Sequence, residues 1–134
     1  MPIFPLSLFC LVLALALYDF RTRRLPNAVT LPLLAAGLAL RFPGSPALWL
    51  GTALLFAAWH TGALGGGDAK LWLALLWLTP PAQAGAALAV MALALMGTAA
   101  LQLAWRYLRR RRILGVRSPG AWRALPFAVW LLFL

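Results

Sequence analysis

Apolar residues are grouped into six runs along the chain, separated by short segments rich in proline, glycine or charged residues. Several runs approach the roughly 20 residues that a helix needs to cross a bilayer. The runs span residues 2–18, 27–40, 47–64, 71–78, 82–107 and 124–134. The pattern therefore predicts six transmembrane helices. The fourth run is too short to cross unless its helix begins near Asp68 and is extended by the bend at 79–81.

The composition indicates that these helices lie in a membrane. Hydrophobic residues make up 64% of the 134 residues and charged residues 10%, and the mean hydropathy is +0.90. A soluble domain of this length needs more polar surface. We therefore expect an all-α, polytopic membrane protein with a single membrane-embedded domain over residues 1–134. Because no lysine or arginine precedes the first apolar run, we do not expect a cleaved signal peptide.

The basic residues predict how the helices are oriented. Loops that stay in the cytoplasm collect lysine and arginine, and six crossings place 11 of the 12 basic residues on that side, with Arg41 outside. Without the fourth crossing, the arginines at 109–112 would be exported. Both termini are then extracytoplasmic. The net charge of +10 lies at segment ends and not along one solvated face, which argues against nucleic-acid binding.

Asp19 and Asp68 are the only acidic residues, and the predicted topology brings both to the cytoplasmic face. Carboxylates in so apolar a chain are costly. Two carboxyls a few ångströms apart can share a proton, so that one activates water while the other polarises a scissile carbonyl. The pair would titrate as a unit, and the sequence does not say which is acid and which is base. The alternative is that each aspartate is a counter-ion for nearby arginines.

The residues that flank the aspartates add detail to this hypothesis. Gly65, Gly66 and Gly67 precede Asp68 and are expected to end the third helix, leaving bare backbone that an extended peptide can approach. A flexible turn between helices is the simpler interpretation of three glycines. After Asp19, we expect Pro26 and Asn27 to start the second helix, with proline in its first turn and asparagine as its cap.

These motifs together resemble the type IV prepilin peptidase family, whose members are G-x-G-D intramembrane aspartic proteases. The resemblance is carried by Asp19, by Pro26-Asn27 followed by Thr30, and by G-x-G-D-x-K-L from Gly65 to Leu71. It covers nearly the whole chain, and Pro126-Phe127-Ala128 is similar to the segment that opens the family's last helix.

The resemblance implies that Asp19 and Asp68 form a catalytic dyad that cuts the leader from pilin-like precursors at the cytoplasmic face of the bacterial inner membrane. It also implies motif roles for Gly65, Gly67, Pro26, Asn27 and Lys70. For Lys70, a side chain that merely reaches from a helix start to the membrane surface remains an equal alternative.

The chain differs from the larger members of this family, which carry a cytoplasmic insertion with paired cysteines and also methylate the mature pilin. Here the first loop is short, and Cys10 is the only cysteine. We therefore do not expect N-methyltransferase activity, and the compact form looks more like the minimal peptidases of Flp or Tad pili. No cofactor is implied, and two aspartates are too few for a dedicated metal site.

Three other interpretations remain open. A small proton-coupled transporter would use the aspartates as relay sites, with His60 as a third polar group on the third helix. A non-catalytic assembly protein would use the arginines at 109–112 to bind anionic lipid. Presenilin-like proteases also pair Tyr-Asp, here Tyr18-Asp19, with Gly-x-Gly-Asp, but their Pro-Ala-Leu signature is missing. The oligomeric state and the precursor are not indicated.

Overall fold

The computed structural model describes residues 3–22, 24–108 and 120–133. Within these ranges the chain is all-helical, and the six helices predicted from the apolar runs are confirmed. Arg23, Arg117 and the arginines at 109–112, on which part of the predicted orientation rests, lie outside the described residues. The elements are α1 (Ile3–Thr22), α2 (Asn27–Arg41), α3 (Pro46–His60), α4 (Gly66–Leu78), the 3₁₀ turn η1 (Pro81–Gln83), α5 (Ala84–Leu108), the 3₁₀ turn η2 (Ala121–Ala124) and α6 (Leu125–Leu131).

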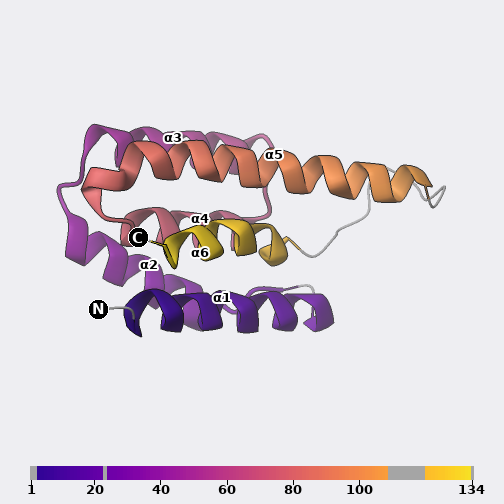
Figure 1. The fold of residues 1–134 in the computed structure, drawn as a ribbon, viewed down its shortest axis with the longest axis horizontal. Helices are drawn as coiled ribbons and strands as arrows, with labels where there is room; N and C mark the ends of the chain where they lie inside the picture. The colour runs from indigo at the N-terminus through magenta and orange to yellow at the C-terminus, as the bar shows by residue number, and fades with distance from the viewer. Residues whose placement is uncertain (1–2, 23, 109–119, 134) are drawn as a thin grey trace.

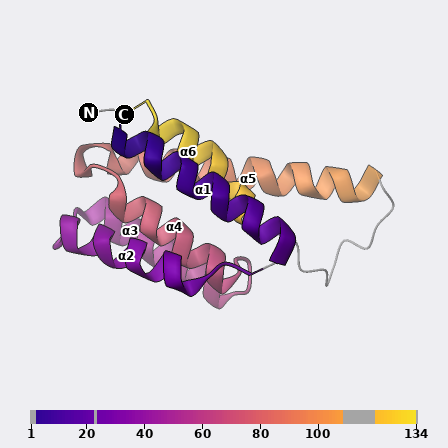
Figure 2. The ribbon, with the colours of Figure 1, turned by 90° about the horizontal axis from the view of Figure 1, so that it is seen from below.

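The helices pack as two groups. In one group α4 packs against α2 and α3, and in the other α1 packs against α6 and η2. Helix α5 contacts α3, α6 and η2, and so joins the groups. Figure 2 shows α2, α3 and α4 on one side of the molecule and α1 with α6 on the other. The start of α1 and the end of α6 lie at the same end of the bundle, while the last turns of α5 extend beyond the opposite end (Figure 1).

Helix α4 is the central element of the bundle. Its residues after Lys70 are apolar on every side of the helix, as expected for a segment without a solvent-facing surface. Trp72 and Trp77 are each 1% exposed. The Trp72 ring lies 5.7 Å from that of Phe127 on α6, and the Trp77 indole N–H donates to Thr52 on α3 at 3.0 Å. Because α4 starts at Gly66, the expectation that the fourth helix begins near Asp68 is confirmed.

The helices differ in their capacity to span a membrane. Among the described residues, one helical stretch, Pro81–Trp105, is by itself long and apolar enough to cross a bilayer. Helices α2 and α3 have 15 residues each, which gives roughly 22 Å of helix against a hydrocarbon core of about 30 Å. Helix α6 has only seven residues. Six separate crossings, and the sides on which the termini lie, therefore stay predictions.

The contact between α2 and α4 depends on a small residue. A Cβ atom added to Gly37 would lie 3.0 Å from Cβ of Trp77 and 3.4 Å from the backbone oxygen of Ala74. At Gly97 on α5, an added Cβ would meet nothing within 4 Å. We expect Gly37→Leu to lower the free energy of unfolding by about 2 kcal/mol, because a buried Trp77 cannot move aside. Gly97→Leu is the matched control.

The thermal midpoint of the detergent-solubilised protein measures this difference. We expect a clearly lower midpoint for the Gly37 variant and a midpoint near that of wild type for the Gly97 variant. Equal midpoints for both variants would show that α2 and α4 do not pack as closely as described.

Candidate active site

Asp19 lies in the last turns of α1 and is only 4% exposed. Its Oδ2 atom accepts two backbone hydrogen bonds, from the N–H of Gly120 at 2.8 Å and from the N–H of Ala121 at 3.1 Å. A buried carboxylate is costly unless such donors reach it. The first N–H groups of a helical turn have no partner within that turn, so the start of η2 supplies donors that Asp19 needs.

Asp68 lies in the first turn of α4, and its position corrects one expectation. The three glycines do not end α3, which stops at His60. Gly65 is instead the N-cap of α4, with extended backbone, and its carbonyl accepts the N–H of Ala69 at 2.9 Å. Negative charge is favoured at a helix start. His60 and Asp68, which the sequence pattern places on one helix, lie on different helices, α3 and α4.

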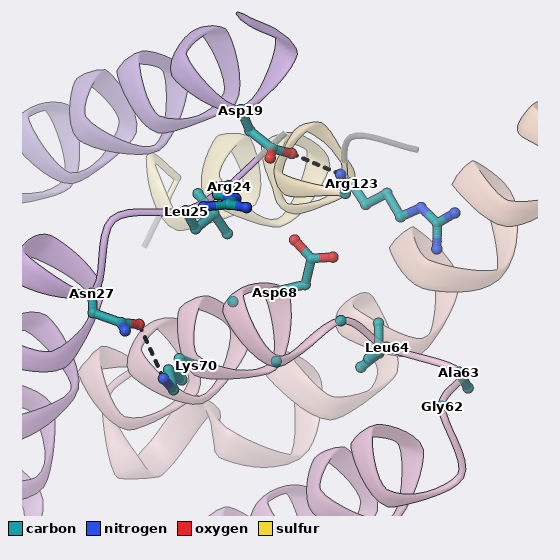
Figure 3. Close-up of a pocket in the computed structure, with 14 residues that line it drawn as sticks. Asp19, Arg24, Leu25, Asn27, Gly62, Ala63, Leu64, Asp68, Lys70 and Arg123 are labelled. Atoms are coloured by element: carbon teal, nitrogen blue, oxygen red, sulfur yellow. Dashed lines mark hydrogen bonds between the residues drawn. The ribbon is translucent and has the colours of Figure 1, made fainter. Parts of the chain in front are cut away.

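The two aspartates meet at Gly120. A Cβ atom built on Gly120 would lie 2.0 Å from Oδ2 of Asp68, while the Gly120 N–H donates to Asp19. Both carboxylates therefore touch the same residue, which places them within roughly 8 Å of each other. Figure 3 shows the two side chains directed toward a common space from α1 and α4. The prediction that residues 49 positions apart come together is supported by this geometry.

This space is an open pocket of about 750 Å³. One wall is the backbone between α3 and α4, where a Cβ on Gly65 would come within 3.2 Å of Asp68 Oδ2. Gly67 also lines the pocket, and it packs closely on Leu25, because a Cβ there would lie 3.0 Å from Cβ of Leu25. The lining residues include both aspartates, the cationic side chains Arg24, Lys70 and Arg123, and residues 62–67, which form the loop before α4 and its first two residues (Figure 3).

The start of α2 corrects a second expectation. Pro26 is the N-cap residue of α2, and its carbonyl accepts the N–H groups of Val29 and Thr30. No side chain caps this helix. Asn27, expected as the cap, instead accepts a hydrogen bond from the Lys70 ammonium at 3.0 Å. The structure thus brings Asn27 and Lys70 together at the rim of the pocket, a pairing that the sequence analysis did not foresee.

Several pocket residues were missed as site residues, and two of them come from the C-terminal part of the chain. Gly120 and Arg123 come from η2 and its N-cap, and Arg123 also donates a hydrogen bond to Gln102 of α5. The only sequence signal at Gly120 is a Pro-Gly pair before an apolar run, which is typical of any helix start. Within the described ranges, no group of three His, Cys, Asp or Glu residues gathers at this or any other place.

Comparison with known proteins identifies the family to which the chain belongs. The model of the type IV leader peptidase family matches residues 6–103. The chain belongs to the type IV leader peptidase family. The resemblance seen in the sequence is therefore confirmed at family level, and the protein is of a peptidase type. No curated protein and no solved structure matches the chain.

The matched residues 6–103 contain both aspartates and the motif residues around them. They end before η2, so the residues that complete the pocket come from outside them.

The hydrogen bond between Asn27 and Lys70 gives a direct test of the pocket rim. Lys70 is the only lysine in the chain, so an amine-selective reagent followed by peptide mass spectrometry reports on this side chain alone apart from the N-terminus. We expect Asn27→Ala to raise the labelling rate of Lys70 by about 2- to 10-fold, the equivalent of one lost hydrogen bond.

Asn27→Asp is the matched control, because a carboxylate keeps an acceptor in the same place. Lys70 should then react no faster than in wild type. If alanine and aspartate give the same rate as asparagine, the side chain of residue 27 does not hold the ammonium.

Proposed function

We propose that this leader peptidase is an aspartic endopeptidase that removes the leader of type IV pilin-like precursors. The observation that carries the proposal is the meeting of Asp19 and Asp68 at one residue of an open pocket. Family membership supports a peptidase, and paired carboxyl groups are a known means of splitting water for amide hydrolysis. Asp19 and Asp68 are the proposed catalytic residues.

The proposed reaction uses one proton held between the two carboxyl groups. The unprotonated carboxylate takes a proton from water, whose oxygen attacks the scissile carbonyl carbon, while the protonated carboxyl donates its proton to the carbonyl oxygen. The tetrahedral intermediate then collapses and the carbon–nitrogen bond breaks. The leaving amine takes up the proton that came from water, and a hydroxyl group of the intermediate returns a proton to the other carboxylate, which restores the singly protonated dyad. Oδ2 of Asp19 already accepts two N–H groups. We therefore propose that the other oxygen of Asp19, Oδ1, is the atom that contacts the attacking water.

The pocket supports an extended substrate next to the dyad. Its wall at 62–67 contains four glycines, and bare backbone allows a peptide strand to come close. We propose that Gly65 serves this approach, whereas Gly67 serves packing against Leu25. Pro26 starts α2 and so places Asn27 where it holds Lys70 at the rim.

The distribution of charge supports a cytoplasmic position for the dyad. Arg24, Lys70 and Arg123 line the pocket, whereas Arg41 ends α2, which starts beside the pocket at Asn27. This asymmetry follows the rule that basic residues stay in the cytoplasm. We propose a multi-pass protein of the bacterial inner membrane with both termini extracytoplasmic. The leader is then cut on the cytoplasmic side of the precursor's apolar helix.

The short link between α1 and α2 supports a peptidase without methyltransferase activity, of the compact kind that serves Flp or Tad pili. The transporter and assembly alternatives gain no support from the site. His60 is exposed at the end of α3, and both aspartates face one pocket instead of lying at successive depths along a path.

Leader cleavage in membranes tests the proposal. The mass of a pilin-like precursor from the same genome is followed with wild type, Asp19→Asn and Asp68→Asn. Asparagine keeps the shape of the side chain and removes the carboxylate. We expect each variant to lose at least about 100-fold of the cleavage rate, the contribution typical of a general acid or base.

His60→Ala is the control, and we expect it to cut like wild type, because His60 lies outside the pocket lining. The amount of inserted protein and the labelling rate of Lys70 show whether each variant is folded. Cleavage that persists in either asparagine variant would rule out the dyad, and loss of cleavage in the His60 variant alone would favour a polar relay.

A further inference from the structure

The contact between η2 and Asp19 joins parts of the chain that are 101 and 102 residues apart. Both N–H groups of the Gly120–Ala121 pair point at the same oxygen of a buried carboxylate. Hydrogen bonds to an ionised group are shorter and stronger than neutral ones, and two of them restrict its orientation. The position of the Asp19 carboxylate is therefore set by η2 as well as by α1.

Gly120 also limits the space available to Asp68. A Cβ on Gly120 would lie 2.0 Å from Oδ2, 2.5 Å from Cγ and 2.7 Å from Oδ1 of Asp68, so the whole carboxylate lies against its Cα. These distances are too short for any side chain. The reason is space and not backbone conformation, since Gly120 has a φ of −112° and a ψ of −24°, which other residues adopt readily.

The turn that carries Gly120 is itself held firmly. Ala121 and Ala124 are buried, and η2 packs against α1, α4 and α5. The N–H of Arg123 donates to the carbonyl of Gly120 at 3.0 Å, and the Arg123 guanidinium donates to Gln102. A residue in this place cannot move aside without moving helices from both packing groups.

We propose that Gly120 is a positioning residue of the dyad. Its N–H orients the Asp19 carboxylate, and its lack of a side chain lets the Asp68 carboxylate approach to the distance at which the two groups can share a proton. The inference rests on the proposed aspartic peptidase function. It adds a third element, from outside the family-matched residues 6–103, to the two aspartates.

The first test is the kinetics of Gly120→Ala with a precursor that wild type cuts. The added methyl group must displace Asp68, and a displacement of about 1 Å of a reacting group can cost about 100-fold in rate. We expect kcat to fall by about 100-fold while KM stays close to that of wild type, because the substitution does not alter the glycine-rich wall at 62–67 that we propose the substrate approaches. Gly97→Ala is the matched control, since its Cβ meets nothing within 4 Å, and it should retain both constants.

If Gly120→Ala only destabilised the fold, the measurements would give a different pattern. The substitution would lower the thermal midpoint and the amount of inserted protein and leave kcat per folded molecule unchanged, and that result would overturn the proposal. A wild-type kcat in a folded Gly120→Ala protein would do the same. If wild type cuts no precursor, the proposed function fails, independently of Gly120.

A second measurement tests the contact between Gly120 and Asp19 even if Gly120→Ala does not fold. Amide exchange at Gly120 and Ala121 is followed by NMR on protein isotope-labelled at glycine and alanine. We expect Asp19→Ala to speed exchange at both amides by about 10-fold or more, because a hydrogen bond to a charged group is lost. Asp68→Ala, the control, should leave both amides protected. Equal exchange rates in wild type and Asp19→Ala would overturn the proposal.

Discussion

The buried carboxylate of Asp19 needs hydrogen-bond donors, and this requirement connects the site to the fold. Asp19 is almost fully enclosed, and a charge in that position is stable only if hydrogen-bond donors are brought to it. The donors come from η2, at the other end of the chain. To deliver them, α6 has to pack along α1, and η2 has to fit among α1, α4 and α5. Helix α1 thus carries the Asp19 carboxylate, and the packing of the C-terminal helix places the donors that stabilise it.

Asp68 is positioned by a different part of the core. It begins α4, whose buried face and surroundings are set by Trp72 and Trp77. The ring of Trp72 also contacts Phe127 of α6, so the helix that carries Asp68 and the helix next to the donors of Asp19 share one packed contact. The separation of the two carboxylates therefore depends on the core between the two helix groups as well as on Gly120 in the pocket.

The sequence predicted six helices and the pairing of Asp19 with Asp68, because both depend on local patterns: apolar runs, helix boundaries and a family motif. It failed at the boundary between α3 and α4, where glycine signals a helix end and a helix start equally well. It also failed at Asn27, because capping is a local rule and the observed partner, Lys70, is 43 residues away. Hydropathy gave no means of telling that α4 is enclosed by protein, since a buried apolar helix and a lipid-facing one have similar compositions.

Gly120 shows most clearly why such a site is only partly visible in a sequence. Glycine in a chain usually indicates a turn or a left-handed backbone, and neither applies at this residue. What Gly120 contributes is an absent side chain beside Asp68 and a backbone N–H beside Asp19. An absent atom and a main-chain group have no sequence pattern of their own. The two aspartates can be found from chemistry, but the residue that holds them at a working distance is found only when the packing of α1, α4 and η2 is known.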